Sequence, residues 1–306
     1  MSALAGQTTE QTTDRLLAVL RETLDLTGRA ARRRLDPSFW IPRATSTFGA
    51  DLTNTEVDVH GAPWGSQEPT MAFEMARLSM IVIDDYLTSI RKLLEPPFPP
   101  LPMYGQEVLA RSVLESAGFA FWLVDPQITV RQRVARTYLV LWDAAGRAVE
   151  NAKKVGTTQD AASAQAHLDS ILRRVDDLGL GHVKKPRRLI AEERLPSKTD
   201  QVTALLAGKV RGGHEIVYSL YSAVAHGEMT GILSRRLDPP ASGATSVMTI
   251  TPRQLVGNVE LAVVAFGQLQ ERLCSGGMGS GPRELASWSW EHNVGRRLNA
   301  IKSWLV

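Results

Sequence analysis

An arginine and a glutamate stand in the most apolar helix-forming segment of the chain. In residues 108–124 (VLARSVLESAGFAFWLV) the polar residues are Arg111 and Glu115, each followed by a serine. Residues four apart share one face of a helix, so we expect Arg111 and Glu115 to pair. A helix this apolar should be central, and both charges should be buried with it. Gly118 and Trp122 lie on the same face, where Gly118 would leave room for a small pocket beside the pair.

A histidine stands in a second apolar segment, residues 216–233 (IVYSLYSAVAHGEMTGIL). At helical spacing Ser219, Ser222 and His226 project within about 60° of one another, so they form a polar strip. If the two helices pack together, His226 can approach Glu115. A carboxylate orients a histidine and favours its charged form, which is the arrangement used in general acid–base catalysis. The alternatives are a histidine that is simply hydrogen-bonded in the core and an ion pair that only fixes helix register.

Arg133 and Arg136 lie one helical turn apart in the next helix-forming segment. Guanidinium groups with this spacing could bind a phosphate. The alternative is ion pairing on the helix surface, because Asp125 and Asp143 are near in sequence. Our candidate binding residues are Ser219, Ser222, Trp122 and Arg133.

Two other charge patterns are expected to be structural. Arg77, Asp84 and Arg91 are spaced by seven residues and so lie on one helix face, where they predict an ionic seam with a neighbouring helix. The basic run at residues 32–34 closes the first helix, and its charges are expected to be solvated and favoured by the helix dipole.

Most cofactor and metal chemistry lacks its sequence motif. The chain has no GxxxxGK[ST] loop, no GxGxxG motif after a strand, no HExxH and no paired Glu-x-x-His. Its one cysteine, Cys274, excludes an internal disulfide and a cysteine-based metal cluster, and nothing beside it in sequence supplies a base for nucleophilic catalysis. We therefore predict no cofactor and no metal site.

Composition describes a globular chain with a nearly balanced charge. The 306 residues are 43% hydrophobic and 22% charged, with a formal net charge of +3. Basic and acidic residues are interleaved, so the charge alone names no partner. The N-terminus lacks the pattern of a secretory signal, and the longest apolar windows carry polar residues or are too short to span a bilayer. We expect a soluble cytoplasmic protein without a membrane segment.

Apolar periodicity predicts an all-α protein, a bundle of about eight helices with a long N-terminal loop. The loop is expected at 37–69, with one short strand near 56–59. We divide the chain into residues 1–68, an N-terminal helix and irregular loop, and residues 69–306, a helical bundle domain. The expected helices are 13–35, 69–94, 104–124, 126–154, 159–178, 197–207, 213–233, 251–274 and 284–304.

Three segments, LARSVLESAGFAFWLVD, RQRVAR and YSLYSAVAHG, resemble a group of uncharacterised all-helical proteins common in actinobacteria. More distantly the pattern is similar to the HEPN-type helical proteins, some of which are dimeric toxin or defence ribonucleases. That resemblance implies a catalytic histidine with an arginine a few positions before it. Here the nearest arginine upstream of His226 is Arg211, and Arg111 could replace it across the helix pair. The resemblance rests on Arg111, Glu115, Trp122, Asp125, Arg133, Ser222, His226 and Gly227.

Three functions remain open. The first is a non-catalytic interaction or defence-associated module, in which Arg111, Glu115 and His226 hold the core. The second is an enzyme that uses Glu115 and His226 on a small or nucleotide-like substrate, with Arg111 binding an anionic group. The third is an RNA-binding protein or ribonuclease, with the basic loop at 184–188 as the contact surface. The partner would be a small anionic ligand or RNA, and the apolar faces of the long helices are compatible with a homodimer.

Overall fold

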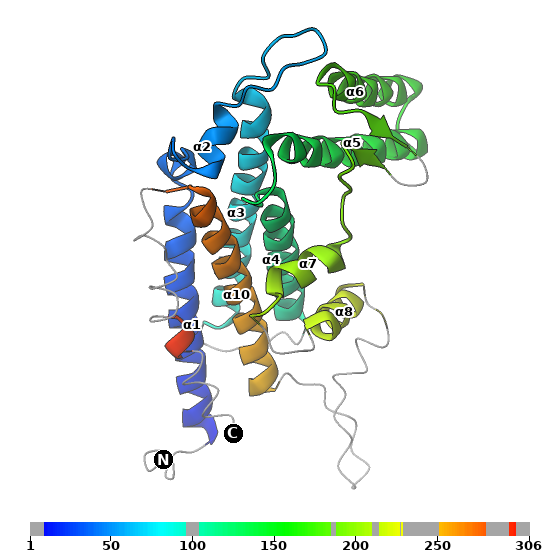
Figure 1. Ribbon diagram of the computed structural model, residues 1–306. Coiled ribbons are helices and arrows are strands. Elements are labelled where there is room, and N and C mark those ends of the chain that lie inside the picture. Colours follow the sequence, from blue (N-terminus) through cyan, green and yellow to red (C-terminus); the bar gives the residue numbers. More distant parts are fainter. Residues whose placement is uncertain are drawn as a thin grey trace.

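Helices account for almost all of the regular structure, which confirms the all-α prediction. The computed structural model describes residues 9–95, 104–184, 188–209, 214–226, 228, 251–279 and 294–297. The predicted helix at 284–304 and the end of the one at 213–233 lie largely outside these residues. The described helices (Figure 1) are α1 (Thr9–Arg33), η1 (Pro37–Trp40, a 3-10 helix), α2 (Thr47–Leu52), α3 (Gln67–Leu93), α4 (Gly105–Leu123), α5 (Val130–Val155), α6 (Thr158–Asp177), α7 (Lys198–Leu206), α8 (His214–Ala225) and α10 (Pro252–Gly276), and strands β1 (His182–Val183) and β2 (Leu189–Ile190) pair antiparallel.

Hydroxyl side chains set the start of four helices. Thr129, Thr157, Ser197 and Thr251 each accept a hydrogen bond from the backbone three residues later, and that residue's side chain bonds back to the cap. These capping boxes satisfy N–H groups that have no partner inside a helix. Gly277 caps the C-terminal end of α10, and its φ of 110° is a left-handed conformation that glycine adopts without strain.

The segment expected to be a long loop contains two short helices. Asp36 caps η1 and Ser46 caps α2, each by accepting a hydrogen bond from a backbone N–H of the first turn. The prediction of a strand near residues 56–59 is wrong. Only an isolated bridge between Val57 and Pro63 forms there, because the chain turns back at Gly61, where φ is 82°.

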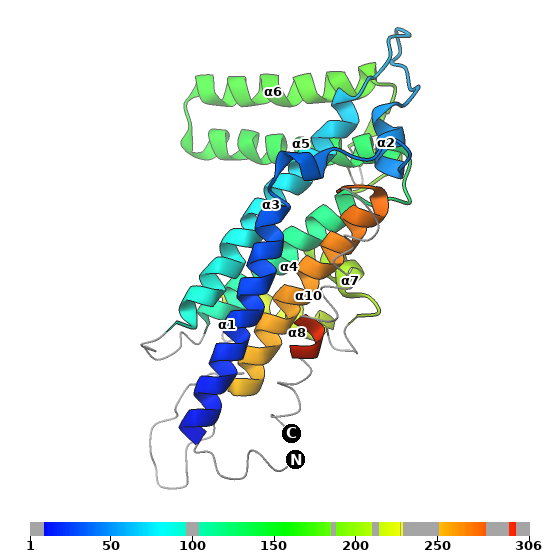
Figure 2. The same cartoon turned by 90° about the vertical axis from the view of Figure 1, so that its left-hand side faces the viewer.

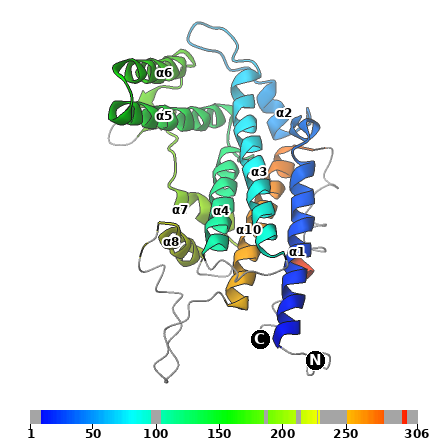
Figure 3. The same ribbon diagram turned by 180° about the vertical axis from the view of Figure 1, so that it is seen from behind.

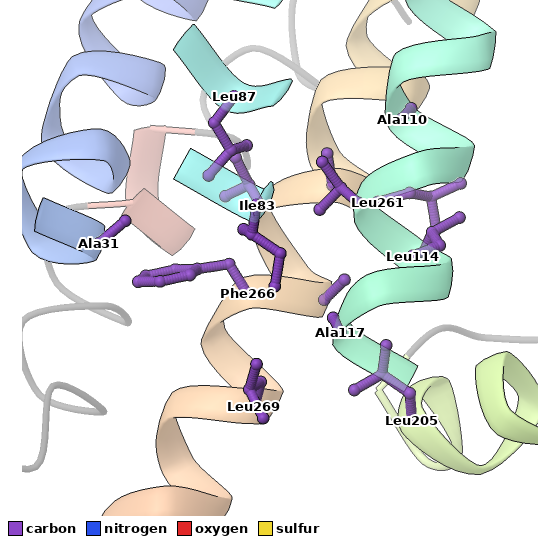
Figure 4. Packing of buried hydrophobic residues seen from close by; sticks show 14 of the residues in the cluster. Ala31, Ile83, Leu87, Ala110, Leu114, Ala117, Leu205, Leu261, Phe266 and Leu269 are labelled. Atoms are coloured by element: carbon purple, nitrogen blue, oxygen red, sulfur yellow. The ribbon is translucent and has the colours of Figure 1, made fainter. Parts of the chain in front are cut away.

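α4 occupies the centre of the main core and packs against α3, α7, α8 and α10. Its buried side chains belong to the same apolar cluster as those of α3 and α10, and Figure 4 labels Leu114 of α4, Ile83 of α3 and Phe266 of α10 among them. α1 packs on the outer side of α3 and α10, and Figure 3 shows it beside α3 from behind. The apolar character of α4 therefore reflects contact with neighbours on several sides.

α5 and α6 form a helical hairpin with a second, smaller core. The two helices lie side by side and cross the direction of the long helices (Figure 2). Trp142 and Val175 are among its buried residues. Glu68 at the start of α3 joins this hairpin to the bundle, because its carboxylate accepts hydrogen bonds from the Tyr138 hydroxyl (2.9 Å) and from Arg174 Nε (2.9 Å).

Arg133 is buried between the two cores, which corrects both expectations for it. Its side chain has no exposed surface, so it neither reaches a phosphate nor pairs on the helix surface. Its Nε donates to Asp51 Oδ2 at 2.7 Å, and its guanidinium lies 4.8 Å from the centroid of the Phe48 ring. Burial raises the pKa of Asp51 and lowers that of Arg133, and the attraction between the charges opposes both shifts.

The predicted ionic seam forms at two of its three positions. Asp84 pairs with Arg32 of α1 at 3.6 Å, and Arg91 pairs with Asp25 of α1 at 3.3 Å. Arg77 instead pairs within α3, with Glu74. The seam therefore ties α1 to α3 along only part of their length.

We predict that Asp51→Ala lowers the free energy of unfolding by about 3–5 kcal/mol, because it leaves a buried guanidinium without a counter-charge. Urea denaturation measures this loss. Asp169→Ala, at an exposed position on α6, is the matched control and should change stability by less than about 0.5 kcal/mol. The double variant Asp51→Leu, Arg133→Met should recover much of the loss. An Asp51→Ala variant as stable as the control would contradict this account.

Candidate functional site

Arg111 and Glu115 form the ion pair that their spacing predicts. Arg111 Nε lies 2.6 Å from Glu115 Oε1, across one turn of α4. The side chains are 15% and 24% exposed, so the expectation of full burial is wrong. α8 packs against this face of α4 without closing it off from solvent. Both charges keep part of their hydration, and their desolvation penalty is smaller than for a fully buried pair.

α8 supplies a second donor to the same carboxylate. The Tyr218 hydroxyl donates to Glu115 Oε1 at 3.0 Å, and the Arg111 guanidinium lies 5.9 Å from the Tyr218 ring centroid. Burial and the neighbouring carboxylate raise the pKa of Tyr218 to about 12, so the hydroxyl keeps its proton and remains a donor. Sequence reasoning missed Tyr218, although it precedes Ser222 by one helical turn and so shares its face.

His226 joins the cluster through Arg111. Arg111 Nη2 lies 3.4 Å from His226 Nε2, and Arg111 Nη1 donates to the backbone carbonyl of Ser222 at 3.4 Å. A guanidinium can only donate, so the first contact is a hydrogen bond when Nε2 of a neutral imidazole accepts. His226 is exposed, not buried as expected. The expected approach of His226 to Glu115 is replaced by a chain in which Arg111 contacts both groups.

Two of the candidate binding residues lie elsewhere. Trp122 stands seven residues beyond Glu115, roughly 10 Å further along α4, where the Arg136 guanidinium lies 5.1 Å from its ring centroid. Arg133 lies in the buried pair with Asp51. Ser219 is exposed on α8, and Ser222 contributes its backbone carbonyl. The structure therefore brings together Arg111, Glu115, Ser222 and His226, and separates Trp122 and Arg133 from them.

Gly118 does not open a pocket. A Cβ built on it would lie 3.1 Å from the backbone carbonyl of Gln201 and 3.2 Å from the backbone nitrogen of Val202, so α7 fills this space. The glycine allows α4 and α7 to approach closely. The enzyme hypothesis with Glu115 and His226 as acid and base expects a substrate pocket beside Gly118. The close contact with α7 counts against that pocket.

A groove does lie on the other side of Glu115, between α3, α4 and α5. It has a volume of about 520 Å³, and Glu115 contributes to its lining together with Leu78 and Val82 of α3 and Lys198 of α7. Lys198 Nζ lies 5.5 Å from the Phe119 ring centroid. Although the residue is exposed overall, partial burial of its amine lowers the pKa of Lys198, and the Glu115 carboxylate opposes that shift. Sequence reasoning missed this groove because it needs the relative placement of three helices.

Neither a metal cluster nor a membrane span is present among the described residues. No group of three or more His, Cys, Asp or Glu residues could hold a metal ion there, and no described helix has the length and apolar character needed to cross a bilayer. Cys274 is buried. Of the basic loop, residues 185–187 lie outside the described part, and Arg188 pairs with Asp143 at 3.1 Å.

Comparisons with known proteins do not place the chain in a family. No protein-family model, no curated protein and no solved structure matches it.

We predict that Gly118→Ala lowers the free energy of unfolding by about 1–3 kcal/mol, because the added methyl group would push α4 away from the α7 backbone. Gly257→Ala in α10 is the matched control. A Cβ there meets nothing within 4 Å, so the helical preference of alanine should stabilise the protein by about 0.5–1 kcal/mol. Thermal unfolding compares the two variants, and a stabilising Gly118→Ala would refute the close contact.

Proposed function

We propose that the protein is a cytoplasmic, HEPN-like helical interaction module that self-associates through the groove between α3, α4 and α5. One observation carries the proposal: large apolar side chains remain exposed there. Leu78 is 55% exposed, and Ile81 and Val82 are each 40% exposed. Their spacing of three and four residues puts them in one strip on α3. A strip of this kind beside an apolar groove is typical of a protein contact surface.

A second copy of the chain suits the groove by its charge as well as its shape. Asp85 continues the α3 strip one turn beyond Val82 and is exposed, and it forms no ion pair with the described residues. The groove carries an amine, Lys198, at its α7 side. In a twofold dimer the same surface of each copy meets the other. The α3 strip of one copy would then enter the groove of the other and bring Asp85 toward Lys198.

The polar cluster supports a non-catalytic role. Glu115 accepts hydrogen bonds from Arg111 and Tyr218, so α4 and α8 are tied together by a carboxylate that already has two donors. His226 is not among the residues that line the groove. The cluster thus positions α8 against α4, and a link to defence systems rests on the HEPN resemblance alone.

Val82→Asp should raise the dissociation constant of the dimer at least about tenfold, because a charge would be buried in an apolar contact. Sedimentation velocity between 1 and 100 µM measures the change. Val183→Asp on β1 is the matched control, because Val183 is also a valine, is 49% exposed and lies outside the groove. A wild-type protein that is monomeric at 100 µM, or a control that dissociates as readily as Val82→Asp, would refute self-association through this groove.

A charge exchange tests the pairing between copies. Asp85→Lys and Lys198→Asp should each weaken the dimer, because each places like charges opposite one another. The double variant Asp85→Lys, Lys198→Asp should restore the dissociation constant to within about threefold of the wild type. If neither single variant changes the dissociation constant, or if the double variant dimerises more weakly than either single one, these residues do not meet across the dimer.

RNA cleavage is a second candidate, and one contact favours it. Arg111 Nη2 lies 3.4 Å from His226 Nε2, so an arginine of α4 stands beside the histidine and could replace the upstream arginine that the HEPN resemblance implies. The His226 imidazole would take the proton of a ribose 2′-hydroxyl while that oxygen bonds to phosphorus, and the 5′-oxygen would leave and take a proton from water. The Arg111 guanidinium would hold the phosphate. The Tyr218–Glu115 bond would keep the guanidinium in place.

If the protein cleaves RNA, Arg111→Ala and His226→Ala should each lower the rate at least about 100-fold. Cleavage of a labelled single-stranded RNA measures the rate, and the dimer dissociation constant, which depends on the groove, should stay unchanged. His167→Ala, at an exposed position on α6, is the control for a histidine that is not in the cluster. Equal cleavage by the wild type and both variants would remove this candidate.

A further inference from the structure

An arginine-lined pocket lies at the end of the molecule where α1 and α10 finish. Figures 1 and 3 show the C-terminal ends of these two helices at the same end of the bundle, next to α2. η1 and the loop after it are joined to the residues that follow α10, because Arg43 N donates to Gly277 O at 3.1 Å and Gly279 N donates to Phe39 O at 3.0 Å. The pocket between them has a volume of about 970 Å³. Its frame is therefore built from backbone hydrogen bonds.

Positive charge dominates the lining of this pocket. Among the described residues, Asp36 is the one acidic residue of the lining, and five arginines surround the space: Arg29, Arg32, Arg33, Arg34 and Arg43. Asp36 is engaged locally, because Ser38 donates to its carboxylate from both the hydroxyl group and the backbone nitrogen, which lowers the pKa of Asp36.

Most of these arginines have no carboxylate partner among the described residues. Arg32 has a carboxylate partner, Asp84, at 3.6 Å. Arg34 lies against the Phe39 ring, 4.6 Å from its centroid. Arg29 and Arg33 form no salt bridge with the described residues, although Arg29 adds to the effect of Arg297 in lowering the pKa of Glu22. Arg43 Nε is buried and lacks a hydrogen-bond acceptor among them. A buried guanidinium donor without an acceptor is destabilising. The charge of Arg43, a lining residue, adds to that of Arg29 and Arg33, and an anion in the pocket would offset all three.

The helix dipole does not account for this many arginines. The C-terminal end of α1 carries a partial negative charge of about one half, and cations in the last turn stabilise it. Arg32 and Arg33 occupy that turn and meet this need. Arg43 comes from the loop before α2, and Arg29 lies one turn earlier on α1. The excess of positive charge therefore belongs to the pocket rather than to the helix end.

We propose that this pocket binds a small molecule that carries two or more linked phosphate groups, a function separate from that of the α3–α4–α5 groove. Phosphate matches the forked donors of several guanidinium groups, and linked phosphates supply negative charge for Arg29, Arg33 and Arg43, lining arginines without a salt bridge to the described residues. The volume suits a molecule of nucleotide size. Ile41 and Pro42 give the pocket an apolar wall, against which an organic group attached to the phosphates could lie.

Isothermal titration calorimetry of the full chain with tripolyphosphate at low salt tests the proposal. Arg29→Gln, Arg33→Gln removes two exposed guanidinium groups of the pocket and should weaken binding at least about tenfold. Arg173→Gln, Arg253→Gln removes the same charge from exposed positions on α6 and α10 and should weaken binding less than about twofold. Thermal unfolding of both double variants shows that each remains folded.

The outcome with other anions fixes the class of ligand. Tripolyphosphate and ATP should bind more tightly than inorganic phosphate, and ATP should exceed tripolyphosphate if a base lies on the apolar wall. No binding of tripolyphosphate at millimolar concentration would overturn the proposal, as would equal losses in the two double variants. A single-stranded RNA that binds far more tightly than ATP, with the same dependence on Arg29 and Arg33, would replace the small ligand by a nucleic acid. None of these results depends on whether the protein dimerises.

Discussion

The C-terminal end of α4 is held by arginines, and the arrangement of the other helices depends on this contact. The last carbonyl groups of a helix have no partners within it. Arg133 Nη1 donates to Leu123 O at 3.3 Å, Arg136 Nη1 donates to Trp122 O at 2.6 Å, and Arg272 Nη1 donates to Phe121 O at 3.4 Å. These donors come from α5 and α10. Three consecutive carbonyl groups therefore fix α4 to both the main core and the hairpin.

The counter-charges of these arginines extend the same contact to other elements. Asp51 of α2 pairs with Arg133, Glu193 pairs with Arg136 at 2.8 Å, and Asp125 pairs with Arg272 at 3.1 Å. With this end of α4 fixed, Arg111 and Glu115 lie further toward its N-terminus and face α8, and Glu115 also lines the groove. The site therefore depends on a contact that includes neither of them.

Patterns within one helix could be predicted, whereas contacts between distant segments could not. Spacing alone paired Arg111 with Glu115, and apolar periodicity located the long helices. The predicted partners of Arg133 were wrong. Its actual partner, Asp51, stands 82 residues earlier, in a helix whose sequence is typical of a loop. The end of α8 was expected to be buried because its residues are apolar, but His226 stands at its exposed C-terminus. A sequence shows which residues share a face, and it does not show how far the neighbouring helix extends.

The arginines of this protein fall into two groups once their partners are known. Those of the α4 contact each have a carboxylate and a carbonyl group, so their charge is balanced inside the fold. Those around the pocket at the end of α1 have one paired carboxylate, that of Asp84, and one acidic neighbour that is already hydrogen-bonded. The net charge of +3 conceals this difference, because balanced pairs elsewhere dilute it. Unbalanced charge in a fixed frame is what recognition of an anion requires, and balanced charge is what holds the helices together.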